Sequence, residues 1–167
     1  MGVTEQVADQ AAVDAVLTAS RTLIAVATQS LGAAAEDTTI AQYRALVVLA
    51  SRGPQRVSDL AAALGVTPST AGRMCDRLVR KGLVRRHRQA GDRRSVRIAL
   101  TAPGRDLVAE VTRRRRAELT RLLRALPADQ HEPVTAAFRA FAAAAGELPQ
   151  PGDAPSRSGW PGRSPTT

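Results

Sequence analysis

The chain has 167 residues, a formal net charge of +9 and a single cysteine, and only 2% of its residues are aromatic. This length predicts one domain, or one domain with appendages, that buries its core without help from a disulfide or a metal ion. The core must then consist of Leu, Val, Ile and Ala, and helices of that composition often complete their burial against a partner subunit.

Apolar residues at helical spacing predict a long amphipathic helix over residues 4–31. They are Val13, Val16, Leu17, Ser20, Ile24, Ala27 and Leu31. Asp9, Asp14 and Arg21 interrupt the apolar stretch, and no basic leader precedes it. We therefore expect neither a signal peptide nor a membrane span, and a cytoplasmic protein.

A second helix is expected after a break at residues 32–37. Thr39 and Gln42 have the spacing of a capping box, in which each side chain bonds to the other residue's backbone N–H. The residues expected to face inward are Ile40, Tyr43, Leu46, Val47 and Leu49. Gly53-Pro54 ends the helix.

Residues 56–82 predict two short helices that share one apolar face, which is a helix-turn-helix. The shared face comprises Leu60, Ala61, Leu64, Val66, Ala71, Met74 and Leu78. Gly65 makes the turn. Thr67 caps the second helix, Pro68 occupies its first turn, and Gly82 closes it.

Two strand-like runs follow, at residues 83–88 and 95–100, and they predict a β-hairpin. Val96, Ile98 and Leu100 alternate with polar or small residues in the second run. The tip, residues 89–94, holds Gly91 for the turn and three charged residues, Asp92, Arg93 and Arg94.

These motifs together resemble the MarR-type winged helix-turn-helix transcriptional regulators. The matching runs are TPSTAGRMCDRLVRKGLVRR (residues 67–86) and the wing signature DRRSVRIALT (residues 92–101), and the resemblance extends over about residues 40–126. It implies a mainly α (α+β) fold with a winged DNA-binding domain at residues 38–100. It also implies an N-terminal dimerisation helix (residues 1–37) and C-terminal dimerisation helices (residues 101–146).

The C-terminal part predicts two more helices, one capped by Thr101 and ending at Pro127, and one over residues 129–145. Their apolar faces comprise Leu107, Val111, Leu119, Leu122 and Leu126, and then Val134, Phe138, Phe141 and Ala145. Pro103-Gly104 stands where the related proteins have helix formers, and we expect a weakened first turn there. Residues 147–167 are rich in Pro, Gly and Ser and predict a disordered tail.

The arginine run at residues 113–116 has two interpretations. It could be a second DNA contact or a targeting tag, but Glu110 and Glu118 lie at helical i,i+3 and i,i+4 spacing from it. We favour a solvated helix face or the rim of a subunit interface.

The positive charge is concentrated around the helix-turn-helix. Residues 52–105 hold thirteen Arg or Lys against three acids, whereas the rest of the chain holds eleven against twelve. A basic segment that coincides with a helix-turn-helix is the electrostatic signature of a protein that binds duplex DNA. Arginine also suits phosphates and guanine edges, although its excess over lysine could reflect a GC-rich coding sequence.

If the second helix of the motif enters the major groove, Ser69, Thr70, Arg73 and Arg77 are the side chains that reach DNA. Arg73 is the best candidate for a guanine contact. Gly72 at mid-helix indicates a close approach of the backbone, or chance usage. The alternative for all of these residues is an ordinary polar surface.

At the wing, the resemblance implies that Arg94 enters the minor groove, that Asp92 holds its guanidinium and that Arg93 grips phosphate. Which of Arg93 and Arg94 lies deeper stays open. So does the interpretation of Asp92 as a turn former only.

Catalysis and metal binding find little support. The sequence has no P-loop, no glycine-rich dinucleotide turn and no His-Glu-x-x-His motif, and Cys75, His87 and His131 are its only soft metal ligands. Some MarR-type proteins sense oxidants through a cysteine in their first helix, but Cys75 lies on the expected recognition helix. We therefore interpret it as a small, partly buried apolar residue.

The sequence thus predicts a homodimeric transcriptional regulator without a cofactor, which binds a pseudo-palindromic operator and represses by occluding it. The resemblance implies a small-molecule effector of unknown identity. The alternative is a winged domain that serves protein–protein contact without operator binding.

Overall fold

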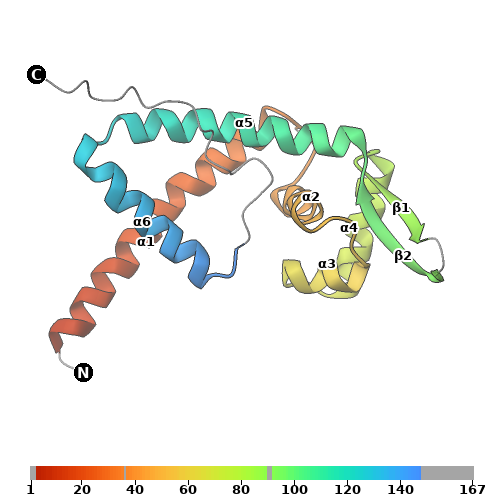
Figure 1. Cartoon of the computed structure of the whole chain (residues 1–167), viewed down its shortest axis with the longest axis horizontal. Helices are drawn as coiled ribbons and strands as arrows, with labels where there is room; N and C mark the ends of the chain where they lie inside the picture. The colour runs from red at the N-terminus through yellow and green to blue at the C-terminus, as the bar shows by residue number, and fades with distance from the viewer. Residues whose placement is uncertain (1–2, 36, 90–91, 148–167) are drawn as a thin grey trace, which may run out of the picture.

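A computed structural model describes residues 3–35, 37–89 and 92–147. The elements in chain order are α1 (Val3–Gly32), α2 (Ile40–Arg52), α3 (Val57–Leu64), α4 (Pro68–Arg80), β1 (Val84–Gln89), β2 (Asp92–Leu100), α5 (Ala102–Arg124), a 3-10 turn η1 (Ala128–Gln130) and α6 (His131–Ala144). Figure 1 shows α2, α3, α4 and the hairpin gathered below one half of α5, while α1 and α6 extend away from the other half. The predicted mainly helical winged helix-turn-helix is confirmed.

The predicted helix caps are present. Thr39 and Gln42 form the capping box of α2, and the Thr67 hydroxyl accepts a hydrogen bond from the Thr70 backbone N–H at 3.2 Å. Each such cap satisfies N–H groups that have no partner within the helix. Local sequence therefore fixes where α2 and α4 begin.

Glycines in the left-handed conformation end the two helices of the motif. Gly65 has φ +66° between α3 and α4, and Gly82 has φ +69° after α4. The Gly82 and Leu83 N–H groups donate to the carbonyls of Val79 and Leu78, at 2.9 and 3.0 Å. These two hydrogen bonds turn the chain sharply at the end of α4, and the hairpin follows.

The hairpin is longer than the sequence predicts. β1 runs through Gln89 and β2 begins at Asp92, so the predicted tip of residues 89–94 shrinks to residues 90–91, which lie outside the described residues together with Gly91. The register pairs Arg88 with Val96 and Gln89 with Asp92. Three residues of β2 therefore lie between two consecutive pairs, which is a bulge that bends the strand.

A single core joins the winged unit to the helices that flank it. Its fully or nearly fully buried members are Leu31, Tyr43, Ala45, Leu46, Leu49, Leu60, Cys75, Leu78, Val84, Ile98, Val108 and Val111. The predicted inward face of the second strand is only partly right. Val96 is 39% exposed because it lies beyond the core, whereas Ala99 on the opposite face is 8% exposed.

The start of α5 shows why glycine stands at residue 104. An added Cβ there would lie 2.0 Å from the Leu83 carbonyl oxygen, and Gly104 N–H donates to the Thr101 hydroxyl at 3.2 Å. The predicted weakening of this turn stays a prediction, but the structure adds a steric reason for the glycine. The missing side chain lets α5 pack directly on the backbone that follows α4.

Arg113, Arg114 and Arg116 are exposed on α5, as the favoured interpretation of a solvated helix face requires, whereas Arg115 is half-buried. Arg113 and Arg114 both form ion pairs with Glu110, and the hydrogen bond from Arg114 lowers the pKa of that carboxyl. Glu118 pairs instead with Arg121, at 2.6 Å. The Arg115 guanidinium lies 5.7 Å from the centre of the Tyr43 ring, a cation–π contact.

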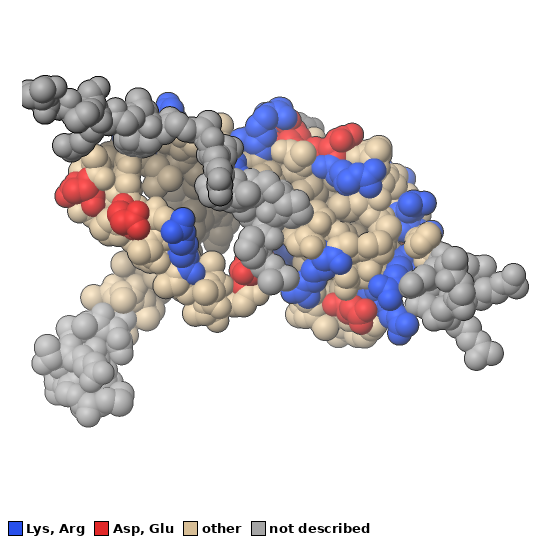
Figure 2. All heavy atoms as spheres, viewed as in Figure 1, with Lys and Arg blue, Asp and Glu red and all other residues tan. Residues whose placement is uncertain are grey.

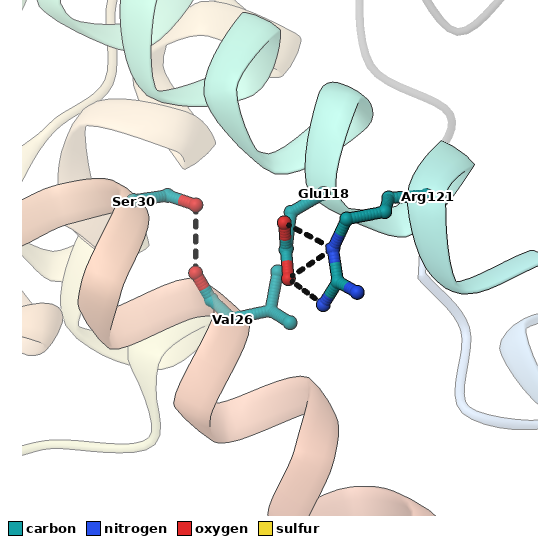
Figure 3. Close-up of polar contacts among 4 residues, drawn as sticks. All are labelled: Val26, Ser30, Glu118 and Arg121. Atoms are coloured by element: carbon teal, nitrogen blue, oxygen red, sulfur yellow. Dashed lines mark hydrogen bonds and ion pairs between the residues drawn. The ribbon is translucent and has the colours of Figure 1, made fainter.

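The C-terminal end of α1 packs against α5. Val26 and Leu31 are 4% and 3% exposed, and the Ser30 hydroxyl donates to the Val26 carbonyl at 2.7 Å. Figure 3 shows the Val26 side chain lying beside the Glu118–Arg121 pair of α5. The two long helices are thereby joined across the middle of α5.

The rest of α1 and all of α6 leave apolar side chains exposed. The largest are Val13, Val16, Leu17, Leu23, Ile24, Phe138 and Phe141, at 40–63% exposure. Leu126, predicted on the buried side of α5, is 38% exposed because α5 ends at Arg124, before it. Within the described residues, Gln10–Gly32 is also long and apolar enough to cross a membrane by length and composition. An exposed apolar face of this size indicates an interaction surface.

Candidate nucleic-acid interface

Helix α4 has two chemically different faces. Ala71, Cys75 and Leu78 are 0% exposed and pack into the core. Three of the predicted DNA contacts, Ser69, Arg73 and Arg77, are exposed on the other side. Met74, predicted on the buried face, is only half-buried, and the neighbouring Cys75 is buried instead.

The fourth predicted contact, Thr70, is half-buried at the start of α4 and belongs to a chain of hydrogen bonds. The Thr67 hydroxyl lies 3.0 Å from those of Ser69 and Thr70. The Thr70 hydroxyl oxygen also accepts a hydrogen bond from Arg73 Nη2 at 3.3 Å. Thr70 therefore contacts Arg73 within the chain, which the sequence did not predict.

Gly72 lies in open space. Apart from its chain neighbours and the nearby backbone of α4 itself, a Cβ built on it would meet no atom of the described residues within 4 Å. No packing within the chain therefore requires glycine in the middle of α4. A close approach of the helix backbone to an external partner and chance usage both stay open.

The predicted wing residues lie in β2. Asp92, Arg93 and Arg94 belong to that strand rather than to a tip loop, and Arg93 and Arg94 fall within its bulge. Their side chains lie outside the described residues, so the predicted contact between Asp92 and Arg94 stays a prediction. The strand carries them away from the core, past the exposed Val96.

Several arginines counted in the basic segment have partners inside the fold, which the sequence did not reveal. Arg86 forms an ion pair with Asp76 at 2.5 Å and so connects β1 to α4. Arg97 Nη1 donates to the Pro54 carbonyl at 3.2 Å, and Arg105 Nη1 donates to the Leu100 carbonyl at 3.2 Å. Only spatial proximity identifies these pairs, because their members are separated along the chain.

The remaining positive charge still gathers on the winged unit. Arg73, Arg77, Arg80 and Arg85 are exposed there. On the face shown in Figure 2, Lys and Arg side chains lie mainly over the winged unit and α5, and few lie over α1 and α6. The exposed arginines of α4, with the exposed Arg85 of β1, produce a positive field next to α4.

Cys75 is the only cysteine of the chain, and its side chain lies in the core. The described residues contain no group of three or more His, Cys, Asp or Glu that could hold a metal ion. The sequence predicted that Cys75 is partly buried, but it is fully buried. Burial raises the pKa of its thiol. A buried neutral thiol is a poor nucleophile.

A family model described as MarR family matches residues 38–96. RV1404 from Mycobacterium tuberculosis is 41% identical in its crystal structure, with a TM-score of 0.79 over 84% of this chain and 95% of that chain. The chain belongs to the MarR family. This membership agrees with the winged helix-turn-helix and its exposed, positively charged α4.

Other relatives of this MarR-family chain are transcriptional regulators. The transcriptional repressor MdtR from Bacillus subtilis is 35% identical over 88 residues, which are 53% of this chain and 57% of that protein. The chain spans about half to three fifths of the length of the curated relatives it matches. MepR from S. aureus, in complex with DNA, is 26% identical with a TM-score of 0.61 over 77% of this chain and 95% of that chain.

Proposed function

We propose that this MarR-family chain is a homodimeric, sequence-specific DNA-binding regulator that represses by occluding a pseudo-palindromic operator. The observation that carries the proposal is the two-faced α4, on which Ser69, Arg73 and Arg77 are exposed opposite a fully buried face. In a helix-turn-helix, such a helix lies in the major groove. The DNA complex of the related MepR supports the same use of the fold.

In this proposal Arg73 contacts a guanine edge, and the hydrogen bond to Thr70 orients its guanidinium. Ser69 and Arg77 contact phosphate or base edges on either side of it. Arg94 enters the minor groove beside the wing, and Arg93 contacts phosphate. The bulge in β2 supports these roles, because it re-aims the strand at the residues concerned.

The homodimer is supported by the exposed apolar side chains of α1 and α6. A second copy of the chain can cover both faces at once, because a two-fold axis places the same surface on both subunits. Two recognition helices then lie about one helical turn apart, with half-site centres roughly 10 bp apart.

We also propose that the protein acts in the cytoplasm and that α1 does not span a membrane. Val26 and Leu31 are buried within the protein at one end of the apolar stretch Gln10–Gly32. The part left for lipid is shorter than the roughly 20 apolar residues that a span requires. A partner chain therefore explains the apolar face of α1 better than a bilayer does.

A small-molecule effector can be accommodated between the winged unit and α5. A cavity of about 660 Å³ lies there, with Leu49, Leu100 and Val108 among its apolar lining residues and Arg85 and Arg105 at its polar side. An effector would act only if it bound with different affinity to two separations of the recognition helices.

Selection of duplex fragments from a random library by the purified protein tests the proposal. We expect enrichment of an inverted repeat with half-site centres about 10 bp apart, protected symmetrically in footprinting. An asymmetric single half-site would contradict the dimer. No enrichment above non-specific binding would favour the alternative, a winged domain that contacts another protein.

A further inference from the structure

The single lysine of the chain joins two parts of the fold that are far apart in sequence. Lys81 is the C-cap residue of the recognition helix α4. Its Nζ donates a hydrogen bond to the backbone carbonyl of Asp37, in the connection between α1 and α2. It also donates to Gln42 Oε1, on the first turn of α2, at 3.3 Å.

The receiving end of this contact is held in place by the fold. Gln42 is 5% exposed and its side chain also accepts from the Thr39 backbone N–H, as part of the capping box of α2. Thr38, next to Asp37, is 7% exposed. The Lys81 ammonium therefore binds one acceptor that is held within the capping box, Gln42 Oε1, and one that adjoins the buried Thr38.

The turn that follows Lys81 is joined to α5 in the same way. The Thr101 hydroxyl donates to the Gly82 carbonyl at 2.6 Å, and the Thr101 N–H donates to the Leu83 carbonyl at 3.1 Å. Thr101 is also the N-cap of α5. The C-terminal end of α4 is thus joined to the start of α5 on one side and, through Lys81, to the α1–α2 connection and the first turn of α2 on the other.

We propose that Lys81 is a positioning residue, which fixes the angle of the recognition helix relative to α1 and α2. The inference rests on the proposed function, because α1 is the helix that we assign to the dimer. In a symmetric dimer, the angle of α4 to α1 sets the spacing of the two recognition helices, and thereby the match to the two half-sites.

The chemistry of lysine suits this task. Its ammonium is a compact charge with three donors on a flexible stem, so it can serve a carbonyl and an amide oxygen together. It also compensates the negative end of the α4 dipole. Because Lys81 is exposed, the competing explanation is a plain phosphate contact, and the experiments must separate the two.

The first experiment measures the position of the winged unit directly. Spin labels at Gln29→Cys on α1 and Ser58→Cys on α3, both exposed, report one distance per chain when labelled protein is diluted with unlabelled protein. The buried Cys75 does not compete for the label. We expect one narrow distance in the parent protein and a broadened or shifted distribution in Lys81→Met.

Arg80→Met is the matched control, because it removes a positive charge from the same exposed turn of α4. We expect it to leave the distance unchanged, and Lys81→Arg to recover most of the narrow distribution. An unchanged distance in Lys81→Met would overturn the proposal, whatever happens to DNA binding. This arm needs no DNA, so it also decides the question if the proposed function fails.

The second experiment measures affinity for the selected operator and for random duplex over a range of salt concentrations. We expect Lys81→Met to reduce the affinity for the operator about tenfold. Its affinity for random duplex should fall no more than that of Arg80→Met. The slope of log K against log[salt] should stay that of the parent, because no phosphate contact is lost. Equal losses on both duplexes with a reduced slope would make Lys81 a phosphate contact and overturn the proposal.

Discussion

At the scale of residues, Arg73 and Arg93 should respond differently to substitution. Arg73→Ala should cost about 1–3 kcal/mol of binding free energy and relax the preference at one base position, because it removes a base contact. Arg93→Ala should weaken binding to all sequences alike, since a phosphate contact carries no sequence information. Affinity measured on operator variants distinguishes the two. Equal, sequence-blind losses would argue against Arg73 as the base reader.

Cys75 should be unreactive in the folded protein. Burial first, and then the charge of Asp76, raises the pKa of its thiol, so folding favours the neutral form. The stability that this provides is complete below the pKa of the unfolded thiol and is lost as pH rises through the higher folded pKa. Iodoacetamide at pH 8 should modify Cys75 only as fast as the chain unfolds, whereas an exposed Ser58→Cys control reacts at once. Rapid labelling of the native chain would reopen an oxidant-sensing role.

At the scale of elements, Gly104 and Gly72 form a matched pair. Ala at 104 would place a Cβ 2.0 Å from the Leu83 carbonyl oxygen, so Gly104→Ala should destabilise the protein by about 1–3 kcal/mol or more. Ala at 72 meets nothing, so Gly72→Ala should stabilise α4 by about 1 kcal/mol. Urea unfolding of both variants tests this pair. If Gly72→Ala stabilises the fold but weakens operator binding, then the α4 backbone approaches DNA closely.

Elements differ in how far the sequence predicted them. The starts of α2 and α4 were predicted correctly, because Thr39 and Thr67 cap them through bonds to residues three positions away. The hairpin was predicted too short, because the length of β1 and β2 depends on pairing between strands and on a bulge. No local signal reports such a register.

At the scale of the whole molecule, the exposed apolar face of α1 should form the dimer. Ile24 is 63% exposed, and Ile24→Asp should shift the protein from dimer to monomer in sedimentation and reduce operator binding with it. Ala62→Asp places the same charge on the exposed part of α3, away from α1, and should leave the sedimentation of the dimer unchanged. A monomeric parent protein, or a dimer that tolerates Ile24→Asp, would contradict the proposed two-fold assembly.

The sequence by itself determined the helix-turn-helix, its caps and its turn glycines, because these depend on apolar spacing and on bonds between near neighbours in the chain. It also located the basic segment. Only the tertiary structure decided which charges are used within the fold, as in the Arg86–Asp76 pair and the Lys81 contact to Asp37. Only the tertiary structure also shows that residue 104 must be glycine, because the Leu83 carbonyl oxygen lies where a Cβ would be. Such contacts join residues from separate elements, and their distances exist only once the core has brought those elements together.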